Sequence, residues 1–240
     1  MNKNHKYWKS FQLKDKSKYY FIKVEGRKLC KSTNEVILPK SDVYICKINI
    51  DEQDALKQEF YFDEKSKIDI IDYLKNSGVS IKMRNTNYQI DKCSIKKFIA
   101  RFKDKELFSG ATIYSQNIND FKKNHKVLKA SNTTWREFAS YFKEPSLSDI
   151  KDETVFNDSH KLIFKKIQKF SYKQIKTQTL NNEKILNSLF KGHDDFSDPY
   201  YATWLLSNDE LTKNINTDFY VTKGSSNGGM NPTVVFKPLK

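Results

Sequence analysis

The order of the expected elements predicts an α/β (α+β) fold, in which a mixed β-sheet is flanked by helices. Strand patterns dominate the N-terminal third, amphipathic helical patterns fill about 94–191, and strand patterns return over about 198–240. Strands on both sides of a helical block can join in sheets that the helices cover. The length of 240 residues, without an obvious linker, predicts a single domain over 1–240.

Three strands are expected before residue 51. The segment KYYFIKVEG (18–26) is rich in aromatic and β-branched residues and closes at a glycine. The segment VILPKSDVYICKINI (36–50) predicts a strand, a tight turn at PKSD and a second strand. Apolar side chains alternate onto both faces of that second strand, so we expect both faces to be partly buried.

One short helix, a second helix and two strands are expected next. DEQDALKQEF (51–60) has an acidic first turn, which favours a helix N-terminus. KIDIIDYLKNSG (67–78) has apolar residues at helical spacing and a glycine just past them, which predicts a helix that a glycine ends. VSIKM (79–83) predicts a strand, and NTNYQID (85–91) predicts a turn into another strand.

The central region predicts a series of helices. In SIKKFIARF (94–102) the apolar residues recur at helical spacing, and we expect Lys96, Lys97 and Arg101 mostly on the opposite, solvent side. Further helical segments are NINDFKKNHKVLKA (117–130), TTWREFASYFKE (133–144, with Thr133 or Thr134 as N-cap) and HKLIFKKIQKFSYKQI (160–175). The closing strands are expected in 198–209, 218–224 and 232–240.

The charge balance favours a polyanionic partner. Lys and Arg number 43 against 29 Asp and Glu, a formal net charge of +14, and such a field attracts phosphate polymers. Lysine enrichment from an AT-rich genome is the competing explanation, but AT-rich coding also brings acidic residues and does not account for so large an excess. Three widely separated cysteines favour neither a disulfide framework nor a zinc site. Neither a signal peptide nor an 18-residue apolar segment is recognisable, so we expect a cytoplasmic protein and no membrane partner.

Two strand segments together suggest a site for phosphodiester hydrolysis. Asp42 opens the strand that follows PKSD, and Ser80, Ile81 and Lys82 lie in the later strand VSIK. Strand residues i and i+2 share a face, so Ser80 and Lys82 are expected on the reactive face, with Val79 and Ile81 buried. Such chemistry needs an oxygen ligand for Mg²⁺ and a cation that orients water.

This arrangement resembles the PD-(D/E)xK nucleases, particularly type II restriction endonucleases. The resemblance covers 36–46 and 78–84, with a looser match through YQIDKCSIKKF and LFSGATIYSQN. It implies a restriction-endonuclease-like core and Mg²⁺-dependent cleavage of double-stranded DNA. It also implies that Asp42 and the Ile81 carbonyl bind the metal and that Lys82 activates water. The sequence departs from the family pattern at Ser80, where the second acid belongs, and in the long gap before it.

Two questions about this site stay open at the sequence level. The literal D-x-K triplet Asp63-Glu64-Lys65 competes with Ser80-Ile81-Lys82, although only the latter lies within an apolar alternation. A further metal ligand must come from elsewhere, and Glu35 is favoured over Glu25 because it is nearer to Asp42 in the chain.

Residues that contact DNA are expected near the active-site lysine and in a glycine-rich segment near the C-terminus. Basic side chains near the site would contact phosphates. The glycine-rich segment TKGSSNGGMNPT predicts either an approach to phosphates or base edges or, equally, an exposed hairpin loop. The oligomeric state is open, a homodimer included, and the rival function is a non-catalytic nucleic-acid-binding protein with a degenerate nuclease fold. The expected DNA contacts are Lys40, Arg84, Lys92, Lys96, Ser225, Ser226, Asn227 and Asn231.

Overall fold

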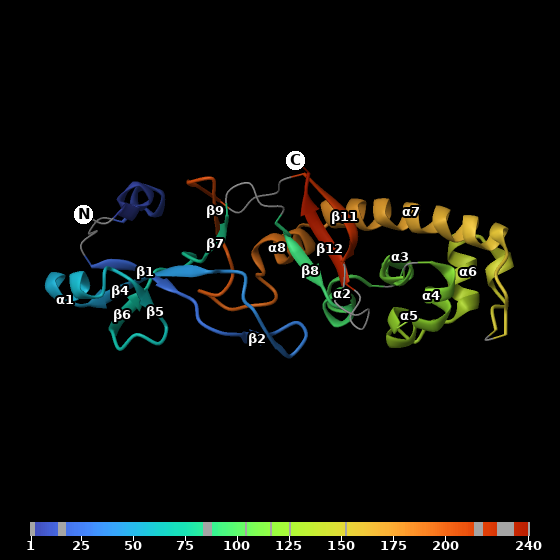
Figure 1. Cartoon of the computed structure of the whole chain (residues 1–240), viewed down its shortest axis with the longest axis horizontal. Coiled ribbons are helices and arrows are strands. Elements are labelled where there is room, and N and C mark those ends of the chain that lie inside the picture. Colours follow the sequence, from blue (N-terminus) through green and yellow to red (C-terminus); the bar gives the residue numbers. More distant parts are fainter. Residues whose placement is uncertain are drawn as a thin grey trace. The chain divides into compact units, whose positions relative to one another are not determined.

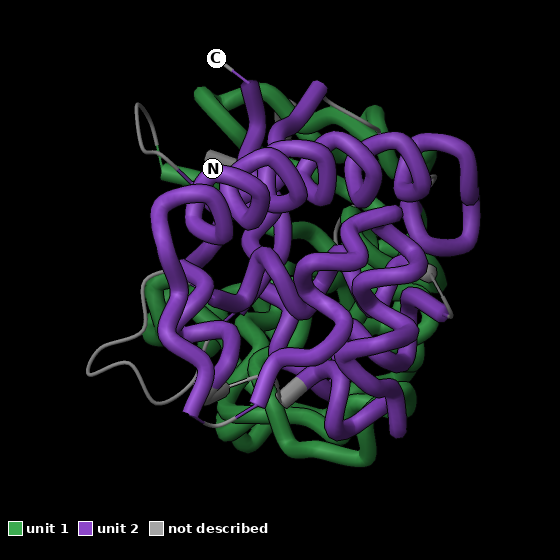
Figure 2. Tube along the Cα trace, turned by 90° about the vertical axis from the view of Figure 1, so that its right-hand side faces the viewer, with its two compact units in different colours: residues 1–87, 187–216 green, residues 88–186, 217–240 purple. Residues whose placement is uncertain are grey.

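The chain forms two compact units in the computed structural model (Figure 2). One comprises 1–87 with 187–216, and the other comprises 88–186 with 217–240. The structure describes residues 3–13, 18–83, 88–103, 105–115, 117–124, 126–151, 153–213, 218–224 and 233–239. A single domain over 1–240 stays an expectation, because two compact units can belong to one domain or to two.

The first unit is built on a mixed seven-stranded sheet, as the sequence predicted (Figure 1). Its strand order is β10-β9-β7-β4-β1-β5, and β6 also pairs with β4. The β1–β4, β4–β6, β4–β7 and β9–β10 pairs are antiparallel, whereas β1–β5 and β7–β9 are parallel. The strands are β1 (Tyr19–Lys23), β4 (Val43–Asn49), β5 (Phe62–Asp63), β6 (Asp69–Tyr73), β7 (Val79–Lys82), β9 (Trp204–Ser207) and β10 (Glu210–Lys213).

Both faces of β4 are buried, which confirms the alternation in VYICKIN. On one face Tyr44, Cys46 and Ile48 pack with residues of β1 and of helix α1 (Glu52–Lys57). On the other face Ile45 packs with Trp8 of the 3-10 helix η1 (Lys3–Phe11). A two-stranded sheet of β2 (Lys28–Cys30) and β3 (Glu35–Ile37) completes the described part of this unit, together with the end of α8 (Glu183–Lys191).

The prediction of a helix in KIDIIDYLKNSG is wrong, because this segment contains strand β6. It pairs with β4 from Cys46↔Tyr73 to Asn49↔Asp69, and the Leu74 N–H donates to the Ile45 carbonyl at 2.8 Å. Gly78 does not end a helix either. A Cβ there would lie 2.0 Å from the Tyr201 carbonyl oxygen, so glycine allows the start of β7 to pass close to that segment.

The second unit combines a three-stranded antiparallel sheet with a group of helices. The sheet has the order β11-β12-β8, with β8 at Asp91–Cys93, β11 at Phe219–Gly224 and β12 at Thr233–Pro238. Aromatic residues such as Phe121, Phe138 and Phe164 fill the helical core. The helices are α2 (Ile95–Arg101), α3 (Lys105–Tyr114), α4 (Ile118–Asn124), α5 (Lys126–Ala130), α6 (Trp135–Phe142), η2 (Pro145–Leu147) and α7 (Asp158–Leu180), and α8 begins in this unit.

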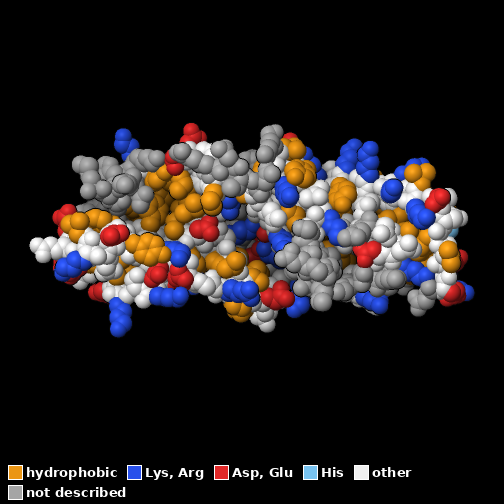
Figure 3. All heavy atoms as spheres, in the orientation of Figure 1, with side chains coloured by type: hydrophobic (Ala, Val, Ile, Leu, Met, Phe, Trp, Pro, Cys, Tyr) orange, Lys and Arg blue, Asp and Glu red, His pale blue; other side chains and the backbone are white. Residues whose placement is uncertain are grey.

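Most of the central helices lie where the sequence predicted them. Thr134 is the N-cap of α6, and its side chain and that of Glu137 form a capping box. None of the described helices has both the length and the apolar run that crossing a bilayer requires. On the face drawn in Figure 3, Lys and Arg side chains are spread among acidic ones over both units.

Candidate functional site

The antiparallel pairing of β4 with β7 brings Asp42 to Ser80. Val43 is the register partner of Val79, and the Asp42 N–H donates to the Val79 carbonyl at 2.8 Å. One step further along this register, Asp42 is opposite Ser80. Residues directly opposite each other in an antiparallel pair share a face of the sheet. Two positions 38 residues apart in the chain are therefore neighbours.

One oxygen of the Asp42 carboxylate is held by the β7 backbone. Asp42 Oδ2 accepts a hydrogen bond from the Ile81 N–H at 2.6 Å and another from Ser80 Oγ at 3.3 Å. The other oxygen, Oδ1, receives no hydrogen bond from the residues that the structure describes. The carboxylate is thus oriented at one oxygen and available at the other.

The turn that carries Asp42 is fixed by the segment around Pro199. Ser41 Oγ donates to the Pro199 carbonyl at 2.9 Å, and the Ser41 N–H donates to the Tyr200 carbonyl at 3.2 Å. Ser41 is fully buried, whereas Asp42 next to it is exposed. The PKSD turn therefore presents its carboxylate from a rigid base.

A cavity of about 500 Å³ opens beside Asp42 and has Ile81 in its wall. Most of the remaining wall is apolar and includes Phe60, Tyr61 and Phe62. This volume lies within the range of small-molecule sites, which are mostly apolar with a few polar groups. A group of about the size of a nucleotide therefore has space next to the Asp42 carboxylate.

The expected burial of β7 is only partly right. Val79 is buried, but Ile81 is 41% exposed, and Ser80 is only 5% exposed instead of facing a reactive surface. The reason is that Ile81 lines the cavity, which leaves its side chain accessible, while Ser80 Oγ donates to Asp42 Oδ2 across the strand pair. Asp42, rather than Ser80, is the exposed polar group of the pair.

Lys82 ends β7 beside the parallel strand β9. Its register partner is Ser207, and strand alternation places it on the same face as Ser80. The side chain is half-buried and is not part of the cavity wall. The structure thus brings Asp42, Ser80 and Ile81 into direct contact, with Lys82 one residue further along the same strand.

Glu35, the expected third ligand, lies in a different sheet. It is in β3, opposite Cys30, and is not among the residues that line the cavity. In the described part of the chain, no group of three or more His, Cys, Asp and Glu side chains has the geometry to hold a metal ion. Asp42 is therefore the carboxylate that the described cavity offers.

The competing triplet Asp63-Glu64-Lys65 serves the local structure. Asp63 Oδ1 accepts hydrogen bonds from the Lys65 N–H at 3.0 Å and from the Ser66 N–H at 2.8 Å. The Ser66 hydroxyl and these two amides lower the pKa of Asp63. Glu64 accepts hydrogen bonds from Lys28 and Tyr44. These contacts describe a turn with a capping carboxylate.

The expected DNA contacts fall into three groups. Lys40 Nζ donates to the Leu189 carbonyl at 2.8 Å, near the C-terminus of α8, so it fastens the turn to that helix. Lys92 and Lys96 are exposed side chains of the second unit. The others, Arg84, Ser225, Ser226, Asn227 and Asn231, lie outside the described residues.

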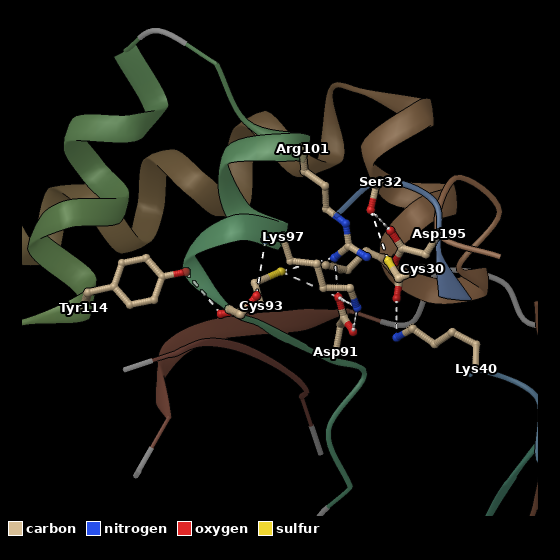
Figure 4. A network of polar contacts seen from close by, with 11 residues as sticks. Cys30, Ser32, Lys40, Asp91, Cys93, Lys97, Arg101, Tyr114 and Asp195 are labelled. Carbon is tan, nitrogen blue, oxygen red and sulfur yellow. Dashed lines mark hydrogen bonds and ion pairs between the residues drawn. The ribbon is translucent and has the colours of Figure 1, made fainter. Parts of the chain in front are cut away.

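A buried charge cluster in the second unit was not expected from the sequence (Figure 4). Lys97 Nζ lies 3.1 Å from Asp91 Oδ1, and Arg101 Nη1 donates to Asp91 Oδ2. The three side chains are almost completely buried, so the expectation that Lys97 and Arg101 face solvent is wrong. Asp91 shares its strand face with buried Cys93, and this alternation is the one sequence signal that could have revealed the cluster.

The chain has no match among protein-family models, curated proteins or solved structures.

Proposed function

We propose that the protein is a Mg²⁺-dependent endonuclease of the type II restriction kind, which hydrolyses phosphodiester bonds in double-stranded DNA. The observation that carries this proposal is the contact of Asp42 with Ser80 and Ile81 across β4 and β7. It supports the pairing of an aspartate at a strand start with an x-K triplet on the neighbouring strand. The restriction-endonuclease-like core remains part of the proposal.

The donor set around Asp42 fits Mg²⁺. Mg²⁺ is commonly held through one or two carboxylates, with waters and substrate phosphates as the remaining ligands. Asp42 offers an exposed carboxylate with one oxygen that no described residue occupies, beside a cavity that admits a phosphate. Asp42 would hold the ion together with the Ile81 carbonyl. Glu35 is not needed for this set.

Each residue of the site has a separate role in the proposal. A bound Mg²⁺ would stabilise the charge that develops on the scissile phosphate. Asp42 stays oriented because Ile81 and Ser80 hold its second oxygen. Lys82 lies on the Ser80 face of β7 and outside the cavity wall; in the proposal its long side chain reaches around the strand end, where the ammonium group would orient the attacking water. Ser80 helps to orient Asp42 through its hydrogen bond and supplies no charge.

The partner in this proposal is duplex DNA. The net charge of +14 favours a polyanion, and counterion release makes such binding strong and salt-dependent. Lys92 and Lys96 are exposed and remain proposed phosphate contacts.

The experiment is Mg²⁺-dependent cleavage of plasmids of varied sequence by wild type, Asp42→Ala, Lys82→Ala and Lys65→Ala, with DNA binding measured in parallel in EDTA. We expect wild type and Lys65→Ala to cut only with Mg²⁺. Asp42→Ala and Lys82→Ala should bind DNA and cut at least about 100-fold more slowly. Cutting by both Asp42→Ala and Lys82→Ala at the wild-type rate would reject the site. Cutting by Lys82→Ala but not by Lys65→Ala would assign the role to Asp63-Glu64-Lys65.

A specific observation favours a second candidate, a nuclease-like protein that binds nucleic acid without cutting it. Ser80 stands where the family has an acid, and Asp42 already caps a backbone amide, which is a purely structural task. In the same experiment, tight DNA binding by wild type without any Mg²⁺-dependent cutting would select this candidate.

A further inference from the structure

Helix α7 is strongly cationic along its whole length. Its 23 residues, DSHKLIFKKIQKFSYKQIKTQTL, contain six lysines and a single acid, Asp158, at the first position. The only charged residues after the first turn are therefore lysines. Counted at about 100° per residue, Lys165, Lys169, Lys173 and Lys166 fall within an arc of about 100° on one side of the helix.

These four lysines, which we call the α7 lysine face, are exposed and have no ion pair among the described residues. The lysines at the two ends of the helix differ, because Lys161 pairs with Asp158 and Lys176 pairs with Asp218, each at 2.8 Å. In Figure 3, several Lys and Arg side chains are visible in the part of the view where Figure 1 draws α7.

The spacing of the lysines in the α7 lysine face lowers the stability of the helix. Lys165, Lys169 and Lys173 follow one another at i,i+4, and each like-charged pair at this spacing destabilises a helix by about 0.2–0.5 kcal/mol. No acid within the helix offsets these pairs. A polyanion that binds along the face would remove the repulsion, which is why the arrangement points to a ligand rather than to a solvated surface.

The opposite side of α7 is already occupied within the second unit. Phe164, Ile167 and Ile175 are buried, and Gln168 Nε2 donates to the Thr112 and Ser115 carbonyls near the end of α3 at 3.0 and 2.8 Å. A helix that lies in a membrane interface buries its apolar side in lipid. Leu162, Phe170 and Leu180 of α7 stay exposed, but the continuous apolar side of the helix is packed in protein, so the α7 lysine face fits a hydrophilic polyanion better than a bilayer.

We propose that the α7 lysine face binds the phosphate backbone of nucleic acid without reading its sequence. Successive lysines at i,i+4 are about 6 Å apart along the helix axis, so each can meet a separate phosphate. Phe170, beside them and 53% exposed, offers an apolar surface to a deoxyribose of the backbone. This inference deepens the proposed function, from which it takes duplex DNA as the partner.

The test compares two triple variants with the same change in charge. The first is Lys165→Gln, Lys169→Gln, Lys173→Gln; the control is Lys129→Gln, Lys143→Gln, Lys151→Gln, three exposed lysines of the second unit outside α7. Binding to a duplex of mixed sequence is measured in EDTA across a salt series, with circular dichroism as a check on folding. Binding to vesicles of phosphatidylserine and phosphatidylcholine is measured as well.

We expect the α7 variant to bind DNA at least 10-fold more weakly at about 0.1 M salt, with a salt slope smaller by about 2–3. The control should remain within about threefold of wild type. Equal losses in both variants, or a loss of vesicle binding without a loss of DNA binding, would overturn the inference. The role of the α7 lysine face can be rejected although wild type cuts DNA, and it can be supported although wild type does not cut. The experiment therefore separates this inference from the proposed nuclease activity.

Discussion

At the scale of single residues, Asp42 combines a structural contact with a free ligand position. Its Oδ2 accepts the Ile81 N–H at 2.6 Å, and this charge-assisted bond fixes the carboxylate plane. Its Oδ1 accepts no hydrogen bond from the residues that the structure describes, and Asp42 is exposed and lines the cavity. The substitution Asp42→Asn can separate these two roles, because the amide keeps an oxygen that accepts the Ile81 N–H but loses the charge that a cation needs.

Ser80 provides a direct test of the cation site. In Ser80→Asp a second carboxylate would face Asp42 at a position that is only 5% exposed, so repulsion and burial should destabilise the protein by more than about 1 kcal/mol. Millimolar Mg²⁺ should restore much of the melting temperature, because an ion that binds the folded state stabilises it.

The neutral, similarly shaped Ser80→Asn is the control and should not respond to Mg²⁺. Thermal unfolding of both variants in EDTA and in Mg²⁺ measures the difference. An identical Mg²⁺ response of the two variants would argue against a cation at Asp42.

Cys46 predicts how stability depends on pH in the alkaline range. Burial first, and the charges of Asp72 and Glu64 second, raise the pKa of its thiol to about 12, whereas an unfolded cysteine has a pKa of about 8.5. Above about pH 8.5 the unfolded chain releases a proton that the folded chain keeps. Stability therefore falls with a slope of about 1.4 kcal/mol per pH unit from this group, until the pH reaches the pKa of the folded state.

Urea unfolding of wild type and Cys46→Ala at pH 8 and pH 10 measures this contribution. Wild type should lose about 2 kcal/mol more than the variant between the two pH values. Equal losses would show that the thiol does not stay protonated in the folded protein.

At the scale of elements, α7 depends on its N-cap. The Asn157 side chain accepts the His160 N–H at 3.0 Å, and His160 Nδ1 accepts the Asn157 N–H at 3.3 Å. Asn157→Ala removes one half of this capping box and should cost about 1 kcal/mol of stability. Asn157→Asp keeps an acceptor and adds a negative charge at the helix N-terminus, so it should cost almost nothing. Denaturant unfolding measures the stability of both variants. Equal losses of stability would contradict the role of the Asn157 side chain as the N-cap of α7.

The junction of β8 and α2 depends on a buried ion pair. Asp91 contacts both Lys97 and Arg101, and its side chain is only 5% exposed. Asp91→Ala would leave two buried cations without this carboxylate, at a cost of about 3–5 kcal/mol. The neighbouring exposed Lys92 is the matched control, and Lys92→Ala should change stability by less than about 0.5 kcal/mol. Similar unfolding midpoints for the two variants would show that the pair contributes little.

At the scale of the whole molecule, the features that could be predicted from the sequence are those that depend on the local spacing of apolar and capping residues. The mixed sheet, the two-sided burial of β4 and most helices followed from alternation, helical spacing and capping residues. The contact between Asp42 and Ser80 agrees with the same strand alternation.

Pairings between distant segments could not be predicted in this way. Ile68, Ile70, Ile71 and Leu74 fit a helix as well as a strand, and the hydrogen bonds of β6 to β4 decide for the strand. Lys97 and Arg101 look like solvent-facing residues until the packing of α2 on β8 brings Asp91 to them. Likewise, the position of Glu35 in a separate sheet depends on the β2–β3 pairing and not on its proximity to Asp42 in the chain.

The most direct test of the central claim is the rate at which Asp42→Asn cuts plasmid DNA with Mg²⁺, relative to wild type. The amide oxygen can still accept the Ile81 N–H, so folding and DNA binding in EDTA should match wild type. The loss of the charge should slow Mg²⁺-dependent cutting by at least about 100-fold. If Asp42→Asn cuts at the wild-type rate, Asp42 is a capping residue and the proposed site is not the catalytic one.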